Sequence, residues 1–159
     1  MIFKDDYFFL STFYICSIEL NIDGKDCKFT NVEAAYQAQK VPEIADHFSQ
    51  IKGLEAKRME GKLRITQNNW EEFRLYAMAN ALHSKFSNKI LYARLCAIKE
   101  PIIHDNYWGD TFWGVYKGKG KNILGKLLMC IRDTNNDINA LYNYISKNLL
   151  AEVNDNENC

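Results

Sequence analysis

The sequence has few prolines and no excess of either charge. Its 159 residues include two prolines, and 20 lysines and arginines balance 20 aspartates and glutamates, which gives a formal net charge of +0. This balance argues against a protein whose main task is to coat nucleic acid or an anionic membrane, although it leaves room for a local basic patch. We expect a chain of this length to form one domain with a sizeable core.

Paired cysteines of the C-x-x-C type and long apolar runs are also missing. No stretch approaches the roughly 20 apolar residues that span a bilayer. The apolar N-terminal run follows two aspartates and is interrupted by polar residues, unlike a signal peptide. The odd number of scattered cysteines is typical of reduced thiols and speaks against a disulfide framework or a zinc site. We therefore expect a soluble cytoplasmic protein with no membrane contact. The cysteines are Cys16, Cys27, Cys96, Cys130 and Cys159.

The first third of the chain predicts a small antiparallel sheet followed by a helix. Residues 14–20 are rich in aromatic and β-branched side chains, and an Asp23-Gly24 turn is expected to join this strand to a second one at residues 27–29. Thr30 and Glu33 then have the spacing of a capping box, which predicts a helix that ends near Pro42.

Helical periodicity dominates the rest of the chain, so we predict an α+β fold that is mostly helical. A single domain is expected over residues 1–150, and the polar residues 151–159 are expected to form a flexible acidic tail. A short strand is expected at residues 102–103, after Pro101. Helices are expected at residues 54–63, from Asn69, after Ser87, and at 137–149; apolar stripes at helical spacing comprise Leu75, Met78, Leu82 and Phe86, and then Ile123, Leu124, Leu127, Leu128 and Ile131.

The segment WGDTFWGVYKGKGKNILGK, residues 108–126, is unusually rich in glycine, lysine and tryptophan. Gly120 to Lys126 spells the G-x-x-x-x-G-K of a P-loop, but Leu127 stands where a magnesium-binding Ser or Thr belongs. The third glycine of a dinucleotide motif is also missing. Two interpretations stay open. The glycines, the lysines and a helix N-terminus near Asn122 hold a phosphate, or the segment is a mobile basic turn without a ligand.

Two carboxylates in apolar surroundings carry the chemistry that the sequence suggests. Glu33 precedes an apolar helix, and Asp110 lies between Trp108 and Trp113. Each has a structural interpretation when taken alone, since Glu33 completes a capping box and an aspartate in a turn bonds its own backbone. Together, two acids and several aromatic rings suit cleavage of a glycosidic bond, where positive charge develops on the sugar. The three histidines lack metal-ligand spacing, so we expect no metal.

Four segments of the chain resemble motifs of the NADAR family, also called YbiA-like. They are FLSTFY at residues 9–14, VEAAYQAQK at 32–40, NYWGDTFWG at 106–114 and GKGKNILGKLLMCIR at 118–132. The chain departs from the pattern at Thr12, where the family motif carries Asn, and at Ala34, where a His is often found. The Thr12 departure bears on substrate identity more than on reaction type.

The resemblance implies an N-glycosidase that needs neither a metal nor a redox cofactor. Its substrate would be a ribosyl phosphate from the riboflavin pathway or ADP-ribosylated guanine, cleaved between ribose C1 and nitrogen. By similarity, Glu33 and Asp110 are the catalytic residues, and the ribosyl ring lies between Trp70 and Trp113. Asp110 activates the attacking water while Glu33 supports the developing oxocarbenium ion, or these roles are exchanged. Carboxyl groups roughly 5 to 10 Å apart would fit this reaction.

The remaining substrate-binding candidates follow from the same resemblance. The expected partner is a small ribosyl or ADP-ribosyl molecule, with ADP-ribosylated nucleic acid as a further candidate. The alternative is a binding module that recognises ADP-ribose or a nucleotide without turnover, and the presence of both carboxylates counts against it. Candidates for contacts with the sugar or its phosphate are Thr12, Lys40, Lys85, Gly118, Gly120 and Asn122.

Overall fold

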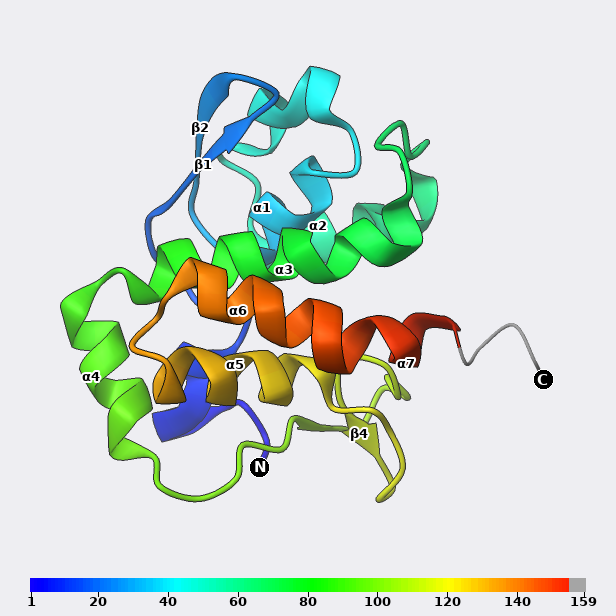
Figure 1. The fold of residues 1–159 in the computed structure, drawn as a ribbon. Helices are drawn as coiled ribbons and strands as arrows, with labels where there is room; N and C mark the ends of the chain where they lie inside the picture. The colour runs from blue at the N-terminus through cyan, green and yellow to red at the C-terminus, as the bar shows by residue number, and fades with distance from the viewer. Residues whose placement is uncertain (155–159) are drawn as a thin grey trace. The chain divides into compact units, whose positions relative to one another are not determined.

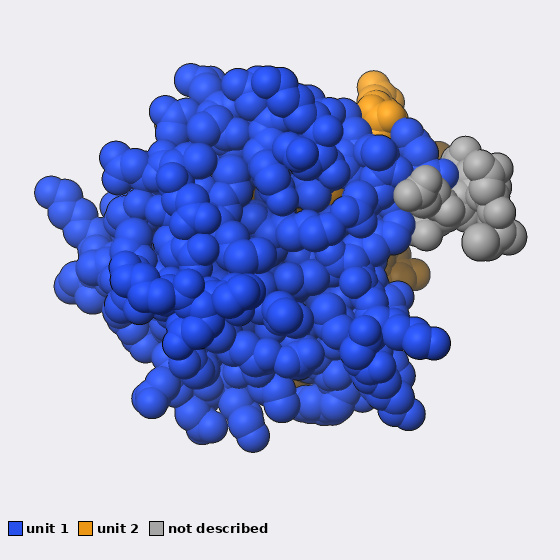
Figure 2. All heavy atoms as spheres, turned by 60° about the horizontal axis from the view of Figure 1, so that its bottom comes forward, with its two compact units in different colours: residues 1–11, 86–159 blue, residues 12–85 orange. Residues whose placement is uncertain are grey.

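The computed structural model describes residues 1–154, which divide into two compact units. Figure 2 distinguishes the first unit, Met1–Ser11 with the chain from Phe86 onward, from the second unit, Thr12–Lys85. The single domain over residues 1–150 stays a prediction. The expected flexible tail is wrong over its first part, because Leu150–Asn154 form helix α7 and Val153 is buried. Residues 155–159 of that tail lie outside the described residues.

A two-stranded antiparallel hairpin opens the second unit (Figure 1). Strand β1 (Ile18–Ile22) pairs with β2 (Lys25–Phe29), and the Asp23-Gly24 turn is confirmed by positive φ angles of 51° and 80°. The first strand begins at Ile18, not at residue 14, because β2 ends opposite it at Phe29. This hairpin confirms the small antiparallel sheet.

Helix α1 (Val32–Ala38) follows the hairpin and is buried on every side. The predicted capping box is wrong: the cap is Asn31, whose Oδ1 accepts a hydrogen bond from the Ala34 amide at 2.8 Å. The Asn31 amide also donates to the carbonyl of Ile51 at 2.8 Å, a contact that Thr30 does not make. The cap position moves one residue along the chain, and the Glu33 carboxylate is free of a capping role.

The long helix α3 (Trp70–Phe86) confirms the apolar stripe predicted from residue 69 onward. Leu75, Met78, Leu82 and Phe86 are all buried. The Gln39 side chain ties α1 to this helix, because its amide donates to the carbonyls of Ala35 and Ala77. The second unit is completed by α2 (Gly53–Met59) and two 3-10 turns, Pro42–Phe48 and Glu60–Lys62.

The first unit is built around helix α5 (Ile123–Asp133), against which α4 (Lys89–Ala97) and α6 (Ile138–Tyr144) pack (Figure 1). The predicted stripe of α5 is confirmed, since all five of its members are buried. The strand expected at residues 102–103 is wrong, because the strand lies three residues further on: the two-residue strand β3 (Asp105–Asn106) pairs with β4 (Val115–Tyr116). The unit also contains the 3-10 turn Asp5–Leu10 and the π-helical turn Ile145–Leu149.

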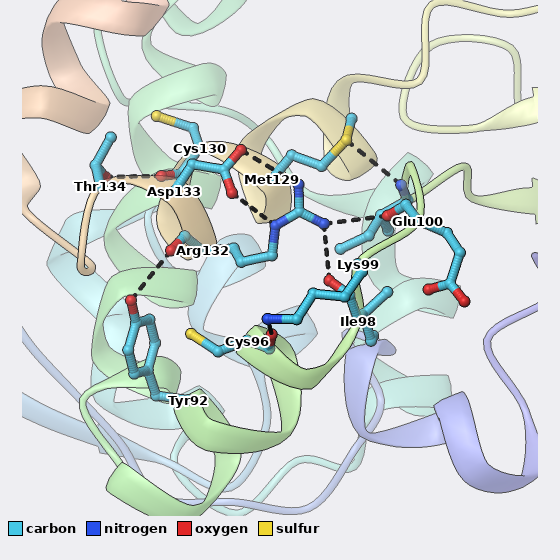
Figure 3. A network of polar contacts seen from close by, with 11 residues as sticks. Tyr92, Cys96, Ile98, Lys99, Glu100, Met129, Cys130, Arg132, Asp133 and Thr134 are labelled. Atoms are coloured by element: carbon cyan, nitrogen blue, oxygen red, sulfur yellow. Dashed lines mark hydrogen bonds and ion pairs between the residues drawn. The ribbon is translucent and has the colours of Figure 1, made fainter.

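Arg132 fixes the C-terminal end of α5 to the segment after α4 (Figure 3). Its guanidinium donates to the carbonyls of Ile98 and Glu100 at 3.0 and 3.1 Å and pairs with Asp133 at 2.7 Å. The Tyr92 hydroxyl donates to the Arg132 carbonyl at 3.1 Å. These bonds hold the chain on its way from α4 to β3. None of the helices in the described part of the chain is long and apolar enough to cross a membrane.

We expect Gly125→Ala to destabilise the protein by about 1–3 kcal/mol, the usual cost of overpacking. A Cβ on Gly125 would lie 2.2 Å from the Ile102 carbonyl oxygen and 2.5 Å from the Asn122 side-chain amide, and backbone cannot yield as a flexible side chain can. The free energy of unfolding in urea measures this cost. Gly61→Ala is the matched control, because nothing lies within 4 Å of the added methyl group. Equal stability of the two variants would contradict the close packing at Gly125.

Candidate active site

The Glu33 carboxylate is buried and held by two side chains of the second unit. Glu33 is 5% exposed, and its Oε1 accepts a hydrogen bond from Nε2 of Gln37 at 3.0 Å. Its Oε2 accepts one from the Thr12 hydroxyl at 3.0 Å, and the Glu33 amide donates to the Thr12 carbonyl at 3.0 Å. The structure thus brings Thr12 to Glu33 through both hydroxyl and backbone. A direct contact of Thr12 with substrate stays a prediction.

Burial raises the pKa of the Glu33 carboxyl above its usual range. The hydrogen bond from Gln37, the charge of Lys57 and the hydrogen bond from Thr12 offset part of this rise, and the charge of Glu60 adds to it. A carboxyl with a raised pKa keeps its proton to higher pH and so suits a general acid.

An aromatic and cationic group is formed by residues at and just after the end of α1 and by the first residue of α3. The rings of Tyr36 and Trp70 lie 5.4 Å apart, and Nζ of Lys40 lies 5.3 Å from the first and 5.6 Å from the second. Lys40 is 3% exposed and 3.9 Å from the Glu60 carboxylate. Burial lowers the pKa of Lys40, while the charges of Glu60 and Glu33 raise it. We call Thr12, Glu33, Tyr36, Gln37, Lys40 and Trp70 the Glu33 cluster.

Lys85, the other lysine expected to contact phosphate, is 0% exposed. Its Nζ lies 5.4 Å from the Tyr14 ring, and burial lowers its pKa to about 8, with Cys16 acting in the opposite direction. A phosphate would reach this ammonium only if the surrounding side chains moved. Its role in phosphate binding stays a prediction that the burial does not favour.

Asp110 lies in a loop of the first unit that Asn106 organises; we call residues 106–115 the Asp110 loop. The Asn106 amide donates to the carbonyls of Asp110 and Val115, and its oxygen accepts from the amides of Gly109 and Asp110. Oδ1 of Asp110 in turn accepts from the amides of Phe112 and Trp113, at 3.0 and 2.9 Å. The structure therefore brings Asp110 and Trp113 together through a turn of the backbone.

The apolar surroundings expected for Asp110 are wrong. Asp110 is only half-buried, and the neighbouring Trp108 is 54% exposed. The structural interpretation of this aspartate, as a residue that bonds its own turn, describes Oδ1. Oδ2 takes no part in the turn.

The glycine-lysine segment has a structural role in the first unit. The amides of residues 121–124 donate to carbonyls of residues 111–114, so the N-terminus of α5 does not offer these donors to a phosphate. The Asn122 side chain bonds the His104 amide and the Ile102 carbonyl, and a Cβ on Gly120 would lie 2.2 Å from the Gly114 oxygen. Gly118 lies in an exposed turn with φ of 76°. Of the predicted phosphate-holding groups in this segment, the turn at Gly118 keeps the most space around it.

The histidines and cysteines do not form a metal site in the part of the chain that the structure covers. Among residues 1–154, no three His, Cys, Asp or Glu side chains are grouped so that they could hold a metal ion. His47 is exposed, His83 is half-buried, and His104 is buried against the ring of Phe3. Four cysteines are free thiols, and the fifth, Cys159, lies outside the described residues.

Two residues that organise these sites were missed from the sequence. Gln37 stands one helical turn after Glu33, and that i, i+4 spacing could have suggested the contact. Asn106 opens the motif that contains Asp110 and Trp113. However, an Asn side chain that bonds four backbone groups has no sequence pattern as distinct as that of a capping box. Both are buried amides whose hydrogen bonds position an acid.

A family model for the NADAR domain matches residues 2–134, which include residues of both units. The chain belongs to the NADAR family. It is 33% identical to N-glycosidase YbiA of Escherichia coli (strain K12) and to that of Shigella boydii serotype 4 (strain Sb227), in each case over 140 residues that cover 82% of both chains. The NADAR resemblance seen in the sequence motifs is therefore confirmed.

Two further comparisons define the relation of this NADAR protein to its relatives. The NMR structure of the E. coli protein YbiA has a TM-score of 0.68 and 31% identity, and the match covers 85% of this chain and 82% of that one. This likeness confirms the α+β fold. The chain is also 28% identical over 130 residues to the chloroplastic riboflavin biosynthesis protein PYRR of Zea mays, covering 69% of this chain and 20% of that protein. The names of these relatives support a glycosidase-type activity in the family.

Two substitutions of Asp110 separate its hydrogen bonds in the turn from the charge of its carboxylate. Asp110→Asn keeps the Oδ1 acceptor, so we expect its free energy of unfolding to stay within about 0.5 kcal/mol of the parent. Asp110→Ala loses both hydrogen bonds and should be destabilised by about 1–3 kcal/mol. Urea unfolding of the two variants measures the difference. Equal losses in both would show that the carboxylate charge, and not the turn, determines stability at this position.

Proposed function

We propose that this NADAR protein hydrolyses the bond between ribose C1 and nitrogen in a ribosyl phosphate. The observation that carries the proposal is the buried Glu33 carboxyl, which two side-chain donors hold and whose pKa burial raises. The rings of Tyr36 and Trp70 supply aromatic faces in the same cluster. The names of the YbiA relatives as N-glycosidases agree with this reaction class.

Glu33 acts as the general acid in this proposal. As the C1–N bond breaks, the leaving nitrogen must gain a proton and the ribose carries positive charge. A carboxyl with a raised pKa still holds a proton at a pH where an ordinary glutamate has lost it. The resulting carboxylate, once the proton has left, stabilises the cationic sugar in this mechanism, and an aromatic face adds to that stabilisation.

The roles of the residues in the first unit follow as predictions of the same mechanism. Asp110 activates the attacking water, for which Oδ2 is suited because Oδ1 is used by the turn. Trp113 provides a second ring for the ribosyl group, and the lysines near Gly118, or Lys40 of the second unit, contact the phosphate. No metal ion or redox cofactor enters any step.

The substrate that we propose is a ribosylated aminopyrimidine phosphate of the riboflavin pathway, processed in the cytoplasm. The relative named for riboflavin biosynthesis supports this choice over a modified nucleic acid. The formal net charge of +0 agrees with it, because binding to nucleic acid draws most of its affinity from neutralised phosphates. ADP-ribosylated guanine is the second substrate to test.

The test is a turnover assay with both substrates. Purified protein is given the ribosylated aminopyrimidine phosphate or ADP-ribosylated guanosine, and released base and sugar are quantified by chromatography and mass. We expect base and sugar phosphate in equal amounts from the first substrate. Release from the second alone would move the substrate class to ADP-ribosyl guanine. No release from either substrate, together with binding of ADP-ribose, would overturn the proposed N-glycosidase activity and favour the alternative of a non-catalytic binding module.

A further inference from the structure

The two oxygens of the Glu33 carboxyl face two chemically different donors. Oε1 faces the Gln37 amide nitrogen, and Oε2 faces the Thr12 hydroxyl, each at 3.0 Å. An amide nitrogen donates hydrogen bonds and accepts none, whereas a hydroxyl donates and accepts. The two oxygens are therefore not equivalent when Glu33 gains a proton.

The contact with Gln37 keeps Oε1 free of the proton. A proton on the lone pair of Oε1 that faces Gln37 would meet the N–H of Gln37, and two donors repel each other. The Gln37 side chain is 0% exposed, and its own Oε1 is buried without a hydrogen-bond partner among the described residues. The side chain thus leaves one buried acceptor unsatisfied, which is unfavourable, while its amide donates to Glu33. This arrangement fits a side chain whose role is to position the carboxyl.

The contact with Thr12 accommodates either state of Oε2. The hydroxyl donates to an ionised Oε2, and after rotation about its C–O bond it accepts from a protonated one. Thr12 is half-buried, whereas Glu33 and Gln37 are buried, so Thr12 is the most exposed of the three. The hydroxyl is therefore the group through which the proton of Glu33 can leave.

We propose that the exchangeable proton of Glu33 resides on Oε2 and reaches the leaving nitrogen through the Thr12 hydroxyl, while Gln37 holds Oε1 as an acceptor. This inference rests on the proposed function. Two protons shift and one is transferred in net: the Glu33 O–H bond breaks as the Thr12 oxygen takes its proton, and the original hydroxyl proton of Thr12 passes to the nitrogen as the C1–N bond breaks. Thr12 is a proton relay, and Gln37 is a positioning residue.

Other charged and titratable groups also act on Glu33 and must be separated from this effect. Lys57 on α2 and Glu60 in the turn after it influence its pKa with opposite signs. Tyr36 on α1 and Lys40, just after the end of that helix, interact with its charge as well. None of these groups is altered by the substitutions below, so their influence is common to the variants that are compared.

The decisive measurement is a ¹³C NMR titration of the Glu33 side-chain carboxyl in the full chain, assigned by comparison with Glu33→Gln. Gln37→Met removes a donor to the ionised carboxylate, so we expect the pKa of Glu33 to rise. If Gln37 instead accepted the proton of Glu33 through a turned amide, the same substitution would lower that pKa. A fall, or no change, overturns the proposal. Gln39→Met is the matched control. It also removes a buried side-chain amide, but this amide bonds the carbonyls of Ala35 and Ala77 and not the Glu33 carboxyl.

A measurement on the unsubstituted protein covers the case in which Gln37→Met does not fold. The side-chain amide protons of Gln37 should shift to lower frequency as Glu33 is protonated, because a neutral carboxyl is a weaker acceptor. An amide signal that does not follow the Glu33 titration overturns the assignment of Oε1 as the acceptor.

Turnover of Thr12 variants tests the relay itself. We expect Thr12→Val, which keeps the shape and loses the hydroxyl, to release base at least 100-fold more slowly, and Thr12→Ser to recover most of that loss. Equal rates for the two variants overturn the relay. If the unsubstituted protein releases no base from either substrate, the proposed function and the relay both fail, while the sign of the Gln37→Met shift still decides where the proton of Glu33 resides.

Discussion

Glu33→Gln is expected to slow base release by about 10²–10⁴-fold, the usual contribution of a positioned general acid. The amide cannot supply the proton, although it has nearly the shape of the carboxyl: its oxygen can still accept from the Gln37 amide, and its nitrogen can donate to the Thr12 hydroxyl. The same substitution is expected to stabilise the protein at neutral pH by about 0.5–2 kcal/mol, since removing a functional group from a costly environment commonly does so.

The stabilisation should depend on pH with a definite sign. The pKa of Glu33 is raised in the folded protein, so as pH increases the unfolded chain loses this proton first. The contribution of Glu33 to stability is therefore present below its unfolded pKa and lost as pH rises through its folded pKa. Glu33→Gln has no such titration, and its advantage in free energy of unfolding should grow over that window. Urea unfolding at pH 4 and at pH 7.5 measures it.

The control for this prediction is Glu55→Gln, the same change at an exposed glutamate on α2. It should alter the free energy of unfolding by less than about 0.5 kcal/mol at either pH. A Glu33→Gln variant that is less stable than the parent at pH 7.5 would contradict the account of Glu33 as a carboxyl whose ionised form is destabilised by burial.

Asn106→Ala is expected to be the most destabilising change in the Asp110 loop, by about 2–4 kcal/mol, because it leaves four part-buried backbone groups without their side-chain partner at once. The Asn106 side chain bonds the amides of Gly109 and Asp110 and the carbonyls of Asp110 and Val115. Loss of these bonds should also displace Asp110 and slow base release by at least tenfold. Thermal unfolding and the turnover assay measure the two effects.

Asn106→Asp separates the donors of this side chain from its acceptor. The aspartate can still accept from the amides of Gly109 and Asp110 but cannot donate to the two carbonyls, so its stability should lie between those of the parent and of Asn106→Ala. An alanine variant as stable as the parent would show that the loop keeps its form without the amide.

Periodicity predicted the helices well because burial of one face leaves a repeated signal. The stripe from Leu75 to Phe86 in α3 and the stripe from Ile123 to Ile131 in α5 are apolar at helical spacing, and both are buried. The start of α1 could not be found in the same way. Thr30 and Asn31 are both good cap residues, and the contact of Asn31 with the distant Ile51 carbonyl distinguishes them in the fold.

The sites show the same division between local and tertiary information. Glu33 and Asp110 could be selected as candidate catalytic residues from their types and motifs, but their surroundings could not be predicted. The Asp110 loop folds back on the start of α5, so that carbonyls of residues 111–114 occupy the amides of residues 121–124. No spacing in the sequence indicates that contact. The phosphate-holding interpretation assumed that the amides at this helix end were available to a ligand.

The most direct test of the account is base release by the unsubstituted protein and by Glu33→Gln, side by side, from the ribosylated aminopyrimidine phosphate at pH 7. We expect equal amounts of base and sugar phosphate from the parent and at least a 100-fold slower release from the variant, whose urea unfolding confirms that it is folded. Release at the same rate from both proteins would contradict Glu33 as the acid that cleaves the bond.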